Sequence, residues 1–309
     1  MRARTHTEIY RPYRGTIRDS AARALTLAWS GVRVGFKRKL PMLFLFAIPL
    51  ISTIVGAFRI QLKFDALSKE LSFVPADSTD LQARMANQLV VSGLAELLGS
   101  VEQVILSTLG TLQFFVVLAM GWYGAGLIAE DKRLRANLLY FARPITRWTY
   151  LRGKLGTVLF WGGCVVVVPV TIMCGTAVFA SPDWSFLTDR WPVILKLEAY
   201  ALLWVAVHAL LVLAISSVCR LRNQALAGLF GVYFLTSIAG ELLAWLFDSA
   251  NWRLLSVVRN FERLSEELFG ISSGEVTWGL EASLWALAAF CGLCLTILNA
   301  QVKKLELGR

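Results

Sequence analysis

Few side chains in this sequence are of the kinds that carry out covalent or metal chemistry. The chain has two histidines, His6 and His208, and its five cysteines all lie in or at the ends of apolar runs. Cys291 and Cys294 have CxxC spacing, but no second cysteine pair or histidine lies near them, and a closed zinc site needs four ligands. No GxxxxGKS/T sequence, which would cradle a nucleotide phosphate, occurs in the chain. We therefore expect no catalytic centre, metal site or nucleotide site, and any ATP used must be bound by another chain.

Three ionisable side chains lie within long apolar runs or near their ends. His208 is near the middle of one run, Glu241 is in the outer half of the next, and Glu198 is near an outer end. A charge in the hydrocarbon core costs about 2.5–3.5 kcal/mol on insertion scales, so such residues are usually paired or functional. All three are therefore candidate pathway residues. The alternatives are that the carboxylates are solvated end residues and that the histidine is hydrogen-bonded inside a helix bundle.

The composition indicates an all-α integral membrane protein. Mean hydropathy is +0.59 and 17% of residues are charged, whereas about a quarter are charged in soluble domains. A helix needs about 20 apolar residues to cross the hydrocarbon core of a bilayer. Six runs meet this length and predict transmembrane helices at residues 40–58, 103–128, 155–180, 194–218, 225–247 and 277–300.

The distribution of charge predicts how these spans are oriented. With both termini cytoplasmic, the inside segments are 1–39, 129–154, 219–224 and 301–309. These segments hold 22 of the 31 Lys and Arg residues but only 5 of the 21 acidic ones. Cytoplasmic segments are enriched in Lys and Arg, so we expect both termini inside, in a multi-pass protein of the plasma (inner) membrane. The net charge of +10 follows from this sidedness and does not indicate a nucleic-acid partner.

An amphipathic helix is predicted before the first span. From Thr16 onward, apolar residues that include Leu25 and Trp29 fall on one arc, and basic residues that include Arg23 and Arg33 fall on the other. This pattern is typical of a helix that lies in the membrane interface with its basic side toward lipid headgroups.

Two more segments are predicted on the outer side. Residues 251–270 form an apolar stripe opposite charged residues, which predicts a second amphipathic helix between the fifth and sixth spans. The loop at 59–100 is longer than an ordinary connection, and it is a candidate lid, vestibule or contact for an extracytoplasmic partner. The chain thus divides into residues 1–39 (tail and interfacial helix), 40–300 (six-span domain) and 301–309 (cytoplasmic tail).

The most polar interruption between two spans is the element at 129–154. Glu130 and Asp131 fall near the expected start of a short helix, where carboxylates interact favourably with the helix dipole. Pro144 should end this helix, because it disfavours helical geometry at Arg143. Apolar residues spaced by four, three and four positions would share one helical face: Leu134, Leu138, Phe141 and Ile145. The element is either a basic loop that fixes topology or a docking helix for a cytoplasmic partner.

This element and the overall layout resemble a known family. The residues that carry the resemblance are Glu130-Asp131-Lys132-Arg133, Leu138, Arg143-Pro144-Ile145-Thr146-Arg147, Tyr150 and Gly153-Lys154. Together with six spans and the two amphipathic helices, they are similar to the membrane subunit of ABC-2-type ABC transporters. The sequence departs from that pattern at Arg135-Ala136-Asn137, where relatives often have Gly followed by Thr or Ser.

The resemblance implies a permease that works with a separate ATPase. Two permease copies would bind two ATPase subunits, which hold the ATP and Mg, and the chain would need no cofactor of its own. The element between the second and third spans would be the coupling helix, and export would be the direction of transport. The residues assigned to coupling are Glu130, Asp131, Arg133, Leu134, Leu138, Phe141, Arg143, Pro144, Arg147 and Tyr150.

Two other classes of function compete with this expectation. A non-transporting membrane subunit of an ATPase-driven complex would use the same coupling element to transmit conformational change across the bilayer. An intramembrane enzyme would need a nucleophile, an acid pair or a metal cluster facing a shared cavity, and the sequence does not provide one.

Overall fold

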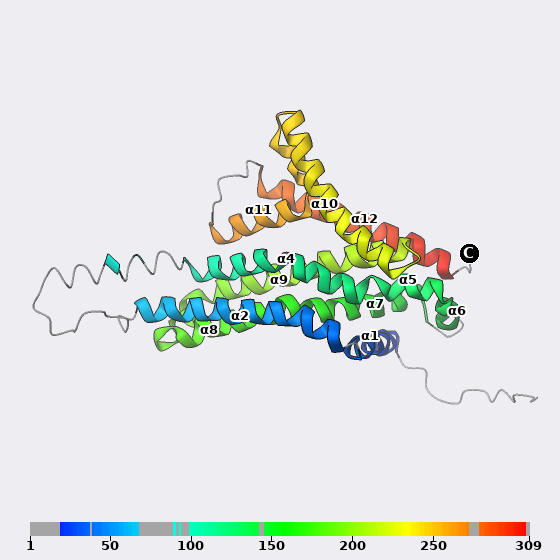
Figure 1. The fold of residues 1–309 in the computed structure, drawn as a ribbon, viewed down its shortest axis with the longest axis horizontal. Helices are drawn as coiled ribbons and strands as arrows, with labels where there is room; N and C mark the ends of the chain where they lie inside the picture. Colours follow the sequence, from blue (N-terminus) through cyan, green and yellow to red (C-terminus); the bar gives the residue numbers. More distant parts are fainter. Residues whose placement is uncertain are drawn as a thin grey trace, which may run out of the picture.

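The structure is a computed structural model in which long apolar segments form helices. It describes residues 19–37, 39–67, 89–90, 93, 99–141, 145–271 and 278–306, and no strand occurs in this part of the chain (Figure 1). The helices are α1 (Ser20–Phe36), α2 (Lys39–Leu67), α4 (Val101–Gly124), α5 (Gly126–Arg133), α6 (Ala136–Phe141), α7 (Arg147–Gly162), α8 (Val168–Ala180), α9 (Ser185–Val218), α10 (Arg222–Leu246), α11 (Val257–Phe269) and α12 (Leu280–Glu306). A π-helical turn (Gly163–Val167) joins α7 to α8, and 3-10 turns (Pro182–Trp184 and Ala250–Leu255) precede α9 and α11.

The six predicted spans are confirmed as helices that are long and apolar enough to cross a membrane. Their bounds are Leu45–Asp65, Val101–Arg133, Arg147–Ala180, Pro182–Val218, Arg222–Leu246 and Leu280–Glu306. Most extend past the predicted ends, because amphipathic turns continue a helix beyond its apolar core. As a consequence, the predicted outer loop at 59–100 is wrong at its start, since α2 continues to Leu67. Residues 68–88 and most of 91–98 lie outside the described residues, so the proposed lid or partner contact stays a prediction.

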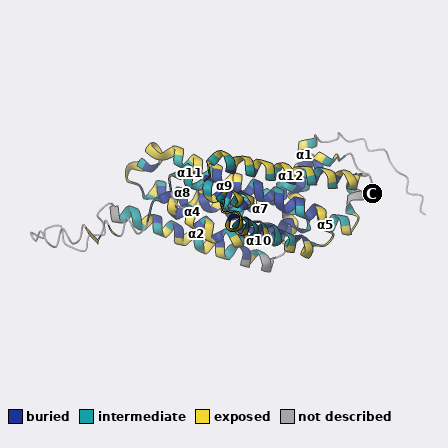
Figure 2. Cartoon of the chain, turned by 90° about the horizontal axis from the view of Figure 1, so that it is seen from above, coloured by how far each residue is buried: buried dark blue, intermediate teal, exposed yellow. Residues whose placement is uncertain are grey.

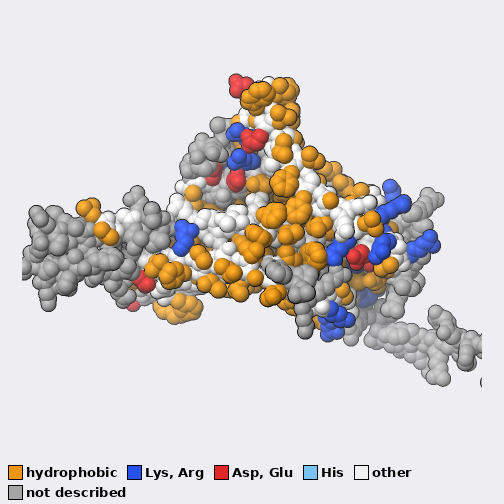
Figure 3. Space-filling model, viewed as in Figure 1, with side chains coloured by type: hydrophobic (Ala, Val, Ile, Leu, Met, Phe, Trp, Pro, Cys, Tyr) orange, Lys and Arg blue, Asp and Glu red, His pale blue; other side chains and the backbone are white. Residues whose placement is uncertain are grey.

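The central helix of the bundle is α9. In its most apolar window 67% of residues are buried, compared with 17% for both α10 and α12. The buried side chains gather where α9 faces α4, α7 and α8, and the outward sides of these helices are exposed (Figure 2). The stacked rings of Tyr123 and Trp161, 4.1 Å apart, join α4 to α7 in this core. The exposed apolar side chains elsewhere cover the surface that a bilayer would contact (Figure 3).

The third span contains a break in its hydrogen-bonding pattern. The N–H of Val168 bonds to the carbonyl of Gly163, one residue farther back than in an α-helix. Pro169 follows at once and has no N–H to donate. A π-helical turn is a common way to absorb such a change inside a helix.

The first helix packs on the third span. It runs across the direction of the spans at one end of the bundle (Figure 1), and its buried residues are Ala24, Ala28, Val32 and Gly35. The contact is close: a Cβ added at Gly31 would lie 2.5 Å from Thr157 Oγ1, and that hydroxyl donates to the carbonyl of Ala28 at 3.1 Å. The predicted apolar arc is therefore divided, because small residues face α7 while Leu25 and Trp29 are exposed. Its position in the membrane interface stays a prediction.

The helix predicted at 251–270 is shorter than expected and is packed into the bundle. A 3-10 turn occupies Ala250–Leu255, and α11 then runs from Val257 to Phe269. Phe261 of α11 contacts Tyr200 and Trp204 of α9, so the apolar side of α11 is buried against other helices. The C-terminal half of α10 stands away from the bundle (Figure 1). The 3-10 turn returns beside it, with the backbone of Trp252 and Arg253 close to Gly240, and α11 then lies along the bundle (Figure 1).

One end of the bundle gathers α1, α5, α6 and the last turns of α12 (Figure 1). Basic side chains are concentrated there (Figure 3), and Arg133, Arg135, Lys303 and Lys304 are exposed. This grouping is the one that the charge asymmetry predicts for a cytoplasmic end.

Candidate functional site

The element between the second and third spans is built from two short helices. The backbone continues in helical geometry from α4 through Ala125 (φ −59°, ψ −32°) into α5. Glu130 and Asp131 therefore lie in the second half of α5. Their expected place at the start of a helix is wrong, because the helix begins with the apolar residues before them.

A serine from the fourth span caps the start of α5. Ser216 Oγ accepts hydrogen bonds from the backbone N–H groups of Ile128 (3.1 Å) and Ala129 (3.2 Å) and donates to the carbonyl of Ala125 (2.7 Å). The first N–H groups of a helix have no partner within it, and α5 has no cap from its own sequence. Ser216 is fully buried, and its role was missed because a cap from a distant helix leaves no local pattern in the sequence.

The reverse contact is made by Lys132. Its Nζ donates to the carbonyls of Ser217 (2.6 Å) and Val218 (3.3 Å) at the end of α9. These carbonyls also lack partners within their helix. Helices α5 and α9 therefore cap each other, which fixes their relative position.

A buried ion pair joins α5 to the third span. Asp131 Oδ2 lies 2.7 Å from Lys154 Nζ and accepts a hydrogen bond of 2.7 Å from the hydroxyl of Tyr150. The two charged side chains are 15% and 9% exposed. Lys154 Nζ also lies 5.5 Å from the ring centre of Tyr140 in α6. Burial, and then the Asp131 carboxylate, raise the pKa of Tyr140, so this ring stays a neutral contact for the lysine.

The predicted continuous apolar face is interrupted between α5 and α6. Arg135 has a positive φ of 54°, which ends one helix before the next begins at Ala136. Leu134 is consequently 65% exposed at the turn, whereas Phe141 and Ile145 are half-buried against the core. The prediction of one helix with Leu134 on the same face is therefore wrong.

Of the remaining predicted coupling residues, Arg133 is exposed, and Arg147 begins α7 with its guanidinium 5.7 Å from the ring centre of Trp148. The side chain of Leu138 and the residues Arg143 and Pro144 lie outside the described part.

The three candidate pathway residues do not share one site. Glu241 pairs with Arg253 (2.9 Å) and Arg259 (3.1 Å) and lines an open groove of about 670 Å³ between α10 and α11. Glu198 accepts a hydrogen bond of 2.8 Å from Thr171. Glu241 is thus paired with two arginines, whereas Glu198 is held by a neutral hydroxyl.

His208 is buried at the junction of α9, α10 and α11. Its Nδ1 lies 2.6 Å from the carbonyl of Trp204, and its ring stacks between those of Trp204 and Tyr233. This geometry agrees with the alternative of a histidine that packs inside the bundle. Glu102, which was not predicted as a site residue, is also buried and pairs with Arg190 at 3.3 Å; it lies just before the predicted start of the second span.

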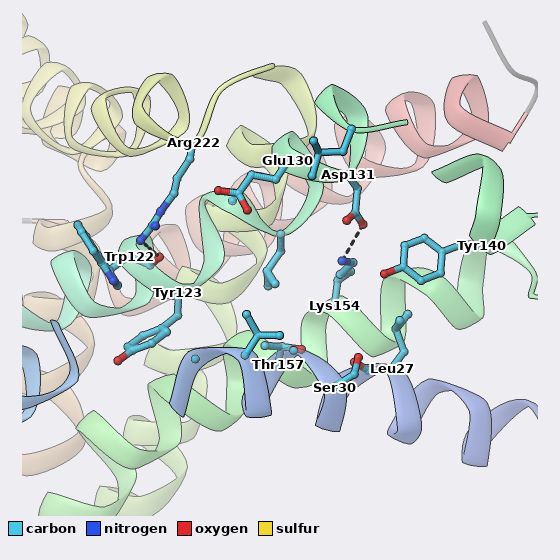
Figure 4. Close-up of a pocket in the computed structure, with 16 residues that line it drawn as sticks. Leu27, Ser30, Trp122, Tyr123, Glu130, Asp131, Tyr140, Lys154, Thr157 and Arg222 are labelled. Carbon is cyan, nitrogen blue, oxygen red and sulfur yellow. Dashed lines mark hydrogen bonds and ion pairs between the residues drawn. The ribbon is translucent and has the colours of Figure 1, made fainter. Parts of the chain in front are cut away.

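A pocket of about 240 Å³ opens beside the coupling element (Figure 4). It lies between α1, α5, α6, α7 and the start of α10, and the Asp131–Lys154 pair forms one wall. At the other wall Arg222 donates to the carbonyl of Trp122 (2.8 Å) and covers its ring, 4.1 Å from the centre. Among the described residues, no group of His, Cys, Asp and Glu side chains could hold a metal ion.

The bundle thus has six spans, and a capped and ion-paired hairpin connects the second span to the third. A family model described as ABC-2 family transporter protein matches residues 25–297. The chain belongs to this family. A search of curated proteins finds no match. As an ABC-2 family protein, the chain is a membrane permease subunit of an ABC transporter, a class that typically carries no catalytic site and works with a partner ABC ATPase.

Proposed function

We propose that the α5–α6 hairpin of this ABC-2 permease couples ATP hydrolysis in a separate subunit to movement of the spans. The observation that carries the proposal is that α5 is fixed to two spans at once. Ser216 and Lys132 join it to α9, and Asp131 joins it to α7 through Lys154 and Tyr150. A displacement of α5 would therefore be passed to the central helix and to the third span together.

The exposed side of the hairpin provides a contact for a partner. Leu134 is an exposed apolar residue at the turn, and Arg133 and Arg135 flank it. Exposed Trp148 with Arg147 stacked on it lies at the start of α7. An ATPase surface with an apolar recess and acidic rim would complement this set of side chains.

The remaining parts of the proposal concern assembly and direction. We propose two permease copies with two ATPase subunits that bind ATP and Mg, export as the direction of transport, and a location in the plasma (inner) membrane with α5 and α6 in the cytoplasm. The family supports a partner ATPase in general, and the basic end that contains α5 and α6 supports the orientation.

The test is a pair of matched substitutions in the assembled transporter. Leu134→Asp should reduce co-purification of the ATPase and permease-stimulated ATP hydrolysis at least about tenfold, because a buried leucine contributes about 1.5–3 kcal/mol. The control is Leu187→Asp at the opposite end of the bundle, where the side chain is 43% exposed. Wild-type assembly and hydrolysis in the Leu134 variant would overturn the docking assignment.

A further inference from the structure

The third span consists of two helices, α7 and α8, joined by the π-helical turn at Gly163–Val167. The hydrogen bond from the N–H of Val168 reaches one residue farther back than in an α-helix. Pro169 follows and, because it has no N–H, donates no hydrogen bond to the preceding turn. Sharp bends in helices occur at π-bulges, at prolines and at pairs of glycine or serine. This short segment has all three features, since Gly162 and Gly163 lie at its start.

The packing around this turn differs between its two glycines. A Cβ added at Gly162 would lie 2.7 Å from Val205 Cγ1 in α9 and 2.9 Å from Met120 Cε in α4, so the backbone is in close contact with both helices. A Cβ added at Gly163 would meet no atom of the described residues within 4 Å. The turn therefore has a closely packed point, which can act as a pivot, beside open space into which the chain can bend.

Helix α7 is held by the helices at the basic end of the bundle. Thr157 donates to the carbonyl of Ala28 in α1 at 3.1 Å, and Lys154 pairs with Asp131 in α5 at 2.7 Å. A Cβ added at Gly156 would lie 3.0 Å from the Cβ of Ala28, so α1 lies directly against α7. Helices α1, α5 and α7 thus form one packed unit.

Helix α8 is held by other helices. A Cβ added at Gly56 of α2 would lie 2.7 Å from Met173 Sδ in α8, and Met173 is fully buried. Thr171 donates to Glu198 in α9 at 2.8 Å. Figure 1 shows α8 beside α2, toward the end of the bundle opposite to α1, α5 and α6. The two halves of the third span are therefore fastened to different groups of helices.

We propose that the π-helical turn is a hinge, about which α7 tilts together with α1 and α5 while α8 keeps its packing on α2 and on the Glu198 region of α9. The inference rests on the proposed coupling role, because it states which part of the bundle follows α5. A displacement of α5 is converted into a change of angle within the third span. A rigid third span would instead carry the displacement to both ends of the bundle.

The test is a pair of spin-label distances in the assembled transporter, in a cysteine-free background, without nucleotide and with ATP plus vanadate. One pair joins Leu50→Cys in α2 to Arg152→Cys in α7, and the other joins the same α2 position to Phe179→Cys in α8. All three positions are exposed. Trapping the nucleotide should shift the first distance by about 2 Å or more, the size of a domain rearrangement, and leave the second unchanged.

Stiffening the turn should reduce this shift. Gly163→Ala combined with Pro169→Ala should lower it by about half or more, because alanine favours a continuous helix over glycine and the N–H missing at position 169 is restored. The matched control is Gly175→Ala in α8, where an added Cβ also meets no described atom within 4 Å, and it should keep the full shift. The two distances in the otherwise unchanged protein decide the proposal even where the stiffened variant does not assemble.

Equal shifts of both distances would show that the third span moves as one body, which would overturn the hinge while the coupling proposal stands. A full shift of the α7 label in the stiffened variant would also overturn it. No shift of either distance on trapping would contradict the coupling proposal and the hinge with it. Failure of the hinge alone is thus distinguishable from failure of coupling.

Discussion

The Asp131–Lys154 ion pair is enclosed by aromatic rings and lies at the contact between α5 and α7. Lys154 Nζ is 5.3 Å from the ring centre of Tyr150, whose hydroxyl also donates to Asp131. Removing one partner of a buried pair leaves an uncompensated charge, whereas removing both is far less costly. The pair therefore makes the position of α5 depend on the third span.

We predict that Lys154→Met and Asp131→Asn each lower the free energy of unfolding by about 3–5 kcal/mol. The double variant should recover most of this loss. The measurement is thermal or denaturant unfolding of the detergent-solubilised protein, with Lys303→Met at an exposed position of α12 as control. Additive losses in the double variant would show that the two charges do not interact.

For individual residues, the sequence predicts the region of the site but not the side-chain contacts within it. Asp131 and Tyr150 were predicted as site residues, and the structure places their side chains 2.7 Å apart. Ser216 could not be predicted, because its partners are 87 and 88 residues away in the chain. Glu241 was selected as a charge within a span, but its arginine partners come from a turn and a helix whose packing hydropathy does not reveal.

The helices themselves follow from the apolar runs, while their ends and breaks depend on tertiary contacts. Helix α5 begins earlier than predicted because α4 runs almost directly into it through Ala125. The break at Arg135 falls at the residues that depart from the family pattern. The apolar periodicity from Leu134 to Phe141 does not predict this break, because the spacing of apolar residues does not show where a residue adopts a positive φ.

The contact between α1 and α7 should be fixed enough to trap with a disulfide. A Cβ added at Gly156 would lie 3.0 Å from the Cβ of Ala28, slightly closer than the roughly 3.5–4.5 Å of disulfides. In a background without the five native cysteines, Ala28→Cys with Gly156→Cys should cross-link on mild oxidation. The readout is the mass of an α1-to-α7 cross-linked peptide. Leu25→Cys with Gly156→Cys is the control, since Leu25 is 72% exposed, and equal cross-linking of both pairs would contradict the packing.

For the molecule as a whole, hydropathy was enough to predict the number of spans but not their arrangement. The apolar runs have similar hydropathy, yet α9 is a mostly buried central helix, whereas α10 and α12 are mostly exposed helices at the periphery. The difference comes from which faces carry small or complementary side chains, and this depends on the other helices. The charge asymmetry did predict that the coupling element, α1 and the end of α12 belong to one end of the molecule (Figure 1).

Accessibility labelling checks which side of the membrane that end faces. In a cysteine-free background, Arg135→Cys should react with an impermeant maleimide only in inside-out vesicles. Asp183→Cys, at the opposite end of the third span, should react in intact cells. Both positions are exposed, so their reactivity reports sidedness. The reverse pattern would place the basic end outside and contradict the positive-inside assignment.

The most direct test of the coupling account is site-specific photo-cross-linking from the exposed turn of the hairpin. A photoreactive residue at position 134 should capture the ATPase subunit in membranes from cells that express the complete transporter. The same residue at position 187, at the other end of the bundle, should not. Capture from 134 that changes in yield when ATP is added would support transmission through α5. No capture from position 134, in a transporter that still hydrolyses ATP and moves its substrate, would contradict the account.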